Sequence, residues 1–222
     1  MEFRVVEIFD SIEGEGIRQG QPATFVRLAG CNLSCAYCDT AYALDEFTTK
    51  SLDEIVKSVN KKYMRVTLTG GEPLISPNVI ELINSLAGEG IEVNIETNGA
   101  VDISGFIENF VIPQKVFFTI DYKLPSSCAS DKMIWRNFEI LRSHDVIKFV
   151  VGSDEDVACM LDITKQLDNI YKEKPRIFIG TVYGNFDNSA LVDIILNEPL
   201  LKDARFQLQI HKIVWDPNKR GV

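Results

Sequence analysis

The feature that most constrains this chain is a group of three cysteines within eight residues, Cys31, Cys35 and Cys38. A stretch this short cannot hold three thiols apart, so we expect them to converge on one centre. Three thiolates can bind three irons of a cubane iron–sulfur cluster and leave the fourth iron open. Structural zinc needs a fourth Cys or His, and the nearest later candidates are Cys128 and His144. The spacing therefore favours an iron–sulfur cluster with one open iron over structural zinc.

The composition indicates one compact domain over residues 1–222. Hydrophobic residues make up 45% of the 222, which is enough for one substantial core. No stretch approaches the roughly 20 apolar residues of a membrane span, and the first residues lack the design of a signal peptide. Five cysteines, three of them in one loop, argue against a disulfide framework. We therefore expect a cytoplasmic protein with reduced thiols.

The charge balance narrows the choice of partners. The formal net charge is −9, with 32 acidic and 23 basic residues. A surface that neutralises many phosphates would need the opposite balance. We therefore expect neither nucleic acid nor a membrane as a direct partner.

Hydrophobic periodicity predicts alternating strands and helices. Helix starts are indicated by the capping box Ser51 to Glu54, by Ser76 before Pro77, and by Ser153 before three acidic residues. Strands that alternate with helices form parallel βα units, and about seven strands with five clear helices favour an incomplete barrel. The predicted strands are 3–9, 24–28, 65–69, 92–96, 116–121, 147–151, 177–182 and 206–210, and the predicted helices lie near 52–62, 77–88, 131–143, 154–172 and 188–197.

Polar and glycine-rich motifs follow four of the predicted strands. A Gly-Gly or Asn-Gly pair alone is more often an ordinary turn. In a parallel barrel, however, the loops at the carboxyl ends of the strands converge on one mouth. We therefore expect a single site built from the cysteine loop, Gly70-Gly71-Glu72-Pro73, Thr97-Asn98-Gly99 and Asp121-Tyr122-Lys123.

The cysteine loop, with an aromatic residue just before its last cysteine, resembles that of the radical S-adenosylmethionine (SAM) enzymes. The resemblance implies an α/β fold, a partial parallel β/α barrel with N- and C-terminal extensions. It also implies a [4Fe-4S] cluster whose open iron binds SAM, and an external reductant such as flavodoxin or ferredoxin. Reductive cleavage of SAM would yield a 5′-deoxyadenosyl radical that removes a hydrogen atom from substrate. The implied SAM contacts are Tyr37, Cys38, Asp39, Gly71, Glu72, Glu96, Asn98, Asp121, Tyr122 and Lys123.

A narrower resemblance involves both ends of the chain: Ser11 to Gly16, the stretch 21–33, Cys38-Asp39-Thr40, and a tail with Trp215. These motifs resemble the branch of the superfamily that serves queuosine and 7-deazapurine biosynthesis. The resemblance implies a carbon–nitrogen lyase that converts 6-carboxy-5,6,7,8-tetrahydropterin to 7-carboxy-7-deazaguanine with loss of ammonia. Thr40 would be the protein ligand of an assisting Mg²⁺. The implied substrate contacts are Ile12, Glu13, Gly14, Glu15, Arg27, Thr69, His211 and Val222.

A role of Arg27 in substrate binding is also indicated by its position in the sequence, independently of the resemblance. It shares a strand face with Phe25 and so can point into the barrel, where an unpaired guanidinium is costly. A substrate carboxylate would be a two-pronged partner, and an outward-facing salt bridge is the alternative. His211 and Lys212, which we place at the end of the last strand, could face the same mouth.

Two other functions remain open at this point. An activating enzyme that generates a glycyl radical on a partner protein would use the same cysteines. A non-catalytic iron–sulfur electron carrier would need neither an open iron nor the Gly-Gly-Glu-Pro motif. The open side of an incomplete barrel could also be covered in a homodimer.

Overall fold

One sheet of nine strands forms the framework of the computed structural model, which describes residues 1–171 and 175–222. The strand order is β3-β1-β2-β4-β5-β6-β7-β8-β9. β2 and β4 to β9 run parallel, whereas β1 and β3 are antiparallel additions at one edge. The strands are β1 Glu2–Ile12, β2 Pro22–Leu28, β3 Thr48–Ser51, β4 Arg65–Gly70, β5 Glu92–Thr97, β6 Val116–Tyr122, β7 Val146–Val151, β8 Arg176–Thr181 and β9 Arg205–Phe206.

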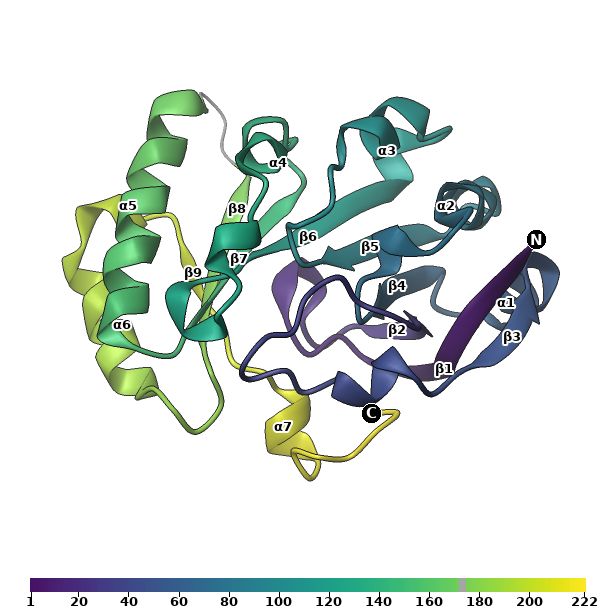
Figure 1. Cartoon of the computed structure of the whole chain (residues 1–222), viewed down its shortest axis with the longest axis horizontal. Helices are drawn as coiled ribbons and strands as arrows, with labels where there is room; N and C mark the ends of the chain where they lie inside the picture. Colours follow the sequence, from purple (N-terminus) through teal and green to yellow (C-terminus); the bar gives the residue numbers. More distant parts are fainter. Residues whose placement is uncertain (172–174) are drawn as a thin grey trace.

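Helices cover the outer side of the curved sheet (Figure 1). Figure 1 shows α2, α3, α5 and α6 along this side, while α7 and the C-terminus lie on the other side. No helix among the described residues is long and apolar enough to cross a bilayer. The helices are α1 Leu52–Ser58, α2 Val79–Gly88, α3 Ser104–Asn109, α4 Trp135–Glu139, α5 Asp154–Ile170, α6 Asn188–Asn197 and α7 His211–Val214.

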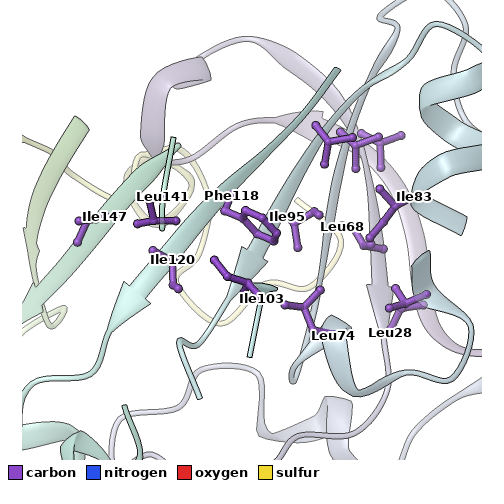
Figure 2. Close-up of a cluster of buried hydrophobic side chains, with 14 of the residues drawn as sticks. Leu28, Leu68, Leu74, Ile83, Ile95, Ile103, Phe118, Ile120, Leu141 and Ile147 are labelled. Carbon is purple, nitrogen blue, oxygen red and sulfur yellow. The ribbon is translucent and has the colours of Figure 1, made fainter. Parts of the chain in front are cut away.

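The main core lies between the sheet and these helices. Alternate strand residues such as Leu68, Ile95 and Phe118 are fully buried there against Ile83 and its neighbours (Figure 2). Burying a side chain of this size contributes about 1.5–3 kcal/mol. Because the side chains of a strand alternate between faces, the residues between these apolar ones face the other side of the sheet. That second face holds the polar site described below.

Two of the predicted helix starts are confirmed. Ser51 and Glu54 form a complete capping box at α1, and the Ser153 hydroxyl accepts a hydrogen bond from the Asp156 amide at α5. The predicted start of α2 at residue 77 is wrong. Ser76 instead closes a 3-10 turn, and Asn78 precedes the helix with φ 61°. Asn tolerates this left-handed conformation, so the helix begins at Val79, two residues later than Pro77 suggests.

The last predicted strand, 206–210, is also wrong for most of its length. β9 ends at Phe206, and His211 and Lys212 begin α7 instead of ending a strand. The side chains of the residues that follow β9 bond the β1–β2 loop: Gln207 Oε1 accepts from the Gly16 amide at 2.9 Å. Of the predicted helix 131–143, only α4 is α-helical. The predicted end of α5 at residue 172 lies outside the described residues. The sequence did not predict β3, α3 and α7, because these elements are too short to show a clear hydrophobic period.

Candidate active site

The cysteine loop follows β2 and forms one wall of a cavity of about 320 Å³. Cys31, Cys35 and Cys38 all line it. The Gly-Gly motif packs directly on this loop, because a Cβ at Gly71 would lie 2.3 Å from the Gly30 carbonyl oxygen. A side chain at that position would push the loop away, so only glycine permits this contact.

The three thiols are the donor set that an iron–sulfur cluster requires, and they fit this group. All three are free, and burial raises the pKa of Cys31 and of Cys35. Among the described residues, no three His, Cys, Asp or Glu side chains lie close enough together to hold a metal ion. Cluster binding would therefore bring the thiolates of this one loop closer together and release their protons.

Glu72 is fully buried and acts as a brace between the Gly-Gly motif and β5. Oε1 accepts hydrogen bonds from the Leu74 amide (3.0 Å) and the Thr97 hydroxyl (2.9 Å). Oε2 accepts from the Asn98 amide at 2.7 Å. Burial raises the pKa of Glu72 to about 7, against the opposing effect of these donors. Its side chain lines neither cavity, so it positions Asn98, which does line the cysteine cavity.

We predict that Glu72→Ala lowers the free energy of unfolding by about 3 kcal/mol or more, because three donors lose their buried acceptor at about 1–3 kcal/mol each. Urea denaturation of the apoprotein measures this change. Glu89→Ala, at an exposed ion pair with Lys61, is the matched control and should change stability by less than about 1 kcal/mol. Equal effects of the two variants would show that Glu72 is not a brace.

A second, larger cavity of about 480 Å³ lies beside the first. Polar side chains from the neighbouring strands β2, β4 and β5 line it side by side. Arg27 of β2 is in register with Thr69 of β4, and the Thr69 hydroxyl donates to Glu96 of β5 at 2.9 Å. Of the residues predicted to contact substrate, the ones that line this cavity are Ile12, Gly14, Glu15, Arg27, Thr69, His211 and Val222. Glu96, expected at SAM, also lines this larger cavity rather than the smaller one.

Arg27 combines the two orientations considered from the sequence. It lines the larger cavity and also forms an ion pair, since Nε donates to Glu7 Oε1 at 2.7 Å. The Tyr42 hydroxyl donates to the same oxygen at 3.0 Å. Within the described part of the chain this pairing uses Nε only. The two terminal amino groups of the guanidinium thus remain for an anion in the cavity.

Glu13 and Tyr122 lie elsewhere. The Glu13 carboxylate is buried, hydrogen-bonds the Thr67 hydroxyl and pairs with Arg18 at 2.5 Å; burial raises its pKa although Arg18 opposes this. The Glu13 amide and carbonyl bond Gln21 and Gly20. The Tyr122 ring packs on Phe138 and Phe149. A substrate contact at Glu13 and a SAM contact at Tyr122 thus have no support in this placement.

The C-terminal segment closes one side of the larger cavity. Gly14 packs so tightly on this segment that a Cβ there would lie 2.2 Å from His211 Nδ1. Burial lowers the pKa of His211. Farther along, the Arg220 guanidinium lies 3.7 Å from the centroid of the Tyr42 ring and 2.8 Å from Glu46. These contacts hold Val222 at the cavity.

The two cavities share one wall. The Asp39 carboxylate pairs with Lys212 at 2.9 Å and so joins the end of the cysteine loop to α7. The Thr40 hydroxyl lies 3.8 Å from Cys38 Sγ. Tyr37, Asp121 and Lys123 line only the cysteine side. Residues that line both cavities are Cys38, Asp39, Thr40, Lys148, Gln209 and Lys212.

Two largely buried cations, Lys148 and Arg18, were not identified from the sequence as part of the site or its support. Lys148 lies in β7, where it is the single charge in the run Val146 to Val151, and this break in an apolar strand was a usable signal. Its ammonium pairs with Glu15 at 3.2 Å and lies 3.8 Å from Asp121. Arg18 gave no clear local signal, because only Glu13 among its partners is near it in the sequence, whereas Val66 and Thr67 lie on β4.

Known proteins resemble the whole chain. A profile of the radical SAM superfamily matches residues 26–110. The 7-carboxy-7-deazaguanine synthase of Clostridium acetobutylicum is 42% identical over 227 residues, covering 100% of both chains. The synthase of Methanospirillum hungatei is 37% identical and covers 96% of this chain and 86% of its own. The crystal structure of QueE from Escherichia coli shares the fold, with a TM-score of 0.74 at 20% identity and 93% coverage of each chain. The predicted α/β fold with a partial barrel is thereby confirmed.

Proposed function

The chain belongs to the 7-carboxy-7-deazaguanine synthase family of radical SAM enzymes, and from this premise we propose that it converts 6-carboxy-5,6,7,8-tetrahydropterin to 7-carboxy-7-deazaguanine with loss of ammonia. The observation that supports this reaction most is the shared wall between the cysteine cavity and the larger polar cavity. The two cavities are therefore adjacent, as the transfer of a hydrogen atom from substrate to a radical requires.

Radical SAM enzymes use SAM and a [4Fe-4S] cluster, and this chain has residues suited to both. Bound together, these groups supply one electron to the sulfonium and a 5′-deoxyadenosyl radical. Cys31, Cys35 and Cys38 would hold the cluster. Gly71 lets SAM approach the backbone, and Asn98 offers a polar side chain beside it.

The larger cavity suits a small anionic heterocycle. Its volume of about 480 Å³ lies in the range of small-molecule sites. The free amino groups of Arg27 match a substrate carboxylate. The Glu15 carboxylate can accept hydrogen bonds from the amino and ring N–H groups of a pterin. A partner protein would instead need an open docking face, and here the tail 217–222 covers one side of the cavity, which disfavours a glycyl-radical activase.

The proposed reaction also uses a Mg²⁺ ion bound at Thr40. Thr40 lines both cavities, so its hydroxyl can bind a Mg²⁺ whose other ligands are water and substrate oxygens. The Asp39 carboxylate, which pairs with Lys212, lines the same two cavities and is a further oxygen donor. This donor set suits Mg²⁺, which prefers oxygen ligands and retains water.

We predict that Thr40→Val lowers turnover roughly tenfold or more and weakens its dependence on Mg²⁺, while the affinity for SAM stays within about threefold. Valine keeps the shape and removes the oxygen ligand. Initial rates over a Mg²⁺ titration, together with SAM equilibrium dialysis, measure both effects. An unchanged Mg²⁺ response would move the metal to another residue, with Asp39 the first to test.

The proposed setting is a homodimer in the cytoplasm that takes electrons from a flavodoxin or ferredoxin. A second copy could cover the open side of the barrel, which ends at β3 and β9. A reducing compartment keeps the five thiols free.

The test of the function is direct. Anaerobically reconstituted and reduced enzyme is given SAM, Mg²⁺ and 6-carboxy-5,6,7,8-tetrahydropterin, and mass spectrometry follows 7-carboxy-7-deazaguanine and 5′-deoxyadenosine. We expect the deazaguanine to form only when all components are present. Cleavage of SAM with another substrate and none with the pterin would refute the reaction and leave the superfamily chemistry.

A further inference from the structure

Lys148 is a cation placed at the wall between the two cavities, and none of the roles described above uses it. It lies in the middle of β7 with its side chain 14% exposed. Its ammonium faces Glu15 on the substrate side and Asp121 on the SAM side. A buried charge loses hydration, so the two carboxylates are what make an ammonium tolerable at this position.

The Lys148 ammonium could in principle donate a proton, since the proposed reaction releases ammonia. Burial alone would lower the pKa of Lys148, but the carboxylates of Glu15 and Asp121 raise it well above its usual range. An ammonium held this firmly is a poor acid near neutral pH. The geometry therefore favours a fixed positive charge over a proton donor.

The distances decide which carboxylate depends on Lys148. Asp121 has a closer cation of its own, Lys123 at 2.7 Å, compared with 3.8 Å to Lys148. Glu15 is 3.2 Å from Lys148, and no other Lys or Arg pairs with it in the described part of the chain. Removing the ammonium would thus leave Asp121 paired and Glu15 without its cation.

Neutral donors complete the support of Glu15. Oε1 accepts from Gln207 Nε2 at 3.1 Å, and Oε2 accepts from Lys148 and from Gln209 Nε2 at 3.4 Å. The carboxylate is therefore held from two sides, with its remaining acceptor positions available to the cavity it lines.

We infer that Lys148 is a positioning residue for substrate: it holds the Glu15 carboxylate in place and oriented toward the amino and N–H edge of the bound pterin. This inference rests on the proposed function, because it names the same substrate and the same cavity. Its consequence is selective: loss of Lys148 should impair substrate binding far more than SAM binding.

The test compares Lys148→Met, Glu15→Gln and the double variant as reconstituted enzymes, with Kd for 6-carboxy-5,6,7,8-tetrahydropterin, Kd for SAM and KM as readouts. Lys148→Met should weaken substrate binding roughly tenfold or more, since charged hydrogen bonds are the strong ones, while SAM affinity changes less than about threefold. In the Glu15→Gln background the same change should cost less than about twofold, because the two residues act as a unit. Lys61→Met, at an exposed ion pair, is the matched control and should match wild type.

Lys148→Arg retains the cation, so it should keep substrate affinity within about threefold of wild type, and it replaces the Met variant if that one does not fold. Additive losses in the double variant, or a loss confined to SAM, would overturn the inference. An Arg variant with a loss of tenfold or more would do the same. Failure of the proposed function looks different, because wild-type enzyme would then neither bind nor convert the pterin.

Discussion

Arg27→Ala is expected to weaken binding of the carboxylated pterin by about two orders of magnitude or more. Truncating one partner of a buried charge pair costs about 2–5 kcal/mol, and each 1.4 kcal/mol is tenfold in affinity. The arginine is only 14% exposed and faces the cavity, so water cannot fully replace it. Substrate Kd and KM measure the effect, and SAM cleavage in the absence of substrate should continue.

Two further variants sharpen this result. Arg27→Lys should rescue binding poorly, because an ammonium cannot pair with Glu7 through one nitrogen while presenting two others to a carboxylate. Arg4→Ala is the matched control, since Arg4 is exposed and stacks on Phe47. Should Arg27→Ala bind substrate as tightly as Arg4→Ala does, the carboxylate site lies elsewhere.

Cys35→Ala is expected to abolish SAM cleavage. Two remaining thiolates cannot hold three irons, so the cluster should be lost or left unable to cleave SAM. Iron and sulfide content, the broad iron–sulfur absorbance and the yield of 5′-deoxyadenosine measure the loss. Cys31→Ala and Cys38→Ala should behave alike.

Cys128→Ala and Cys159→Ala provide the controls from the same chain. Cys128 is exposed on a turn, and Cys159 lies half-buried in α5. Neither lines the cysteine cavity, so both variants should retain the cluster and full activity. Wild-type cleavage in Cys35→Ala would refute the radical chemistry of this chain.

Local patterns in the sequence predicted much of this protein. The parallel strands β2 and β4 to β8 follow from short apolar runs, and the α1 cap follows from Ser51 and Glu54. The cysteine spacing predicts that the three thiols line the same cavity, because they lie within eight residues of one another in one loop. Strand ends predict that separate motifs meet, because parallel strands bring their carboxyl ends to one edge.

Only the tertiary structure decided which polar groups pair. Glu15 and Lys148 are 133 residues apart and meet because the β1–β2 loop lies against β7. Glu72, predicted at SAM, turns inward because three donors are available there. The segment after β9 leaves the sheet because its glutamine side chains bond the same loop. Such pairings depend on the positions of distant strands, so no local period of the sequence encodes them.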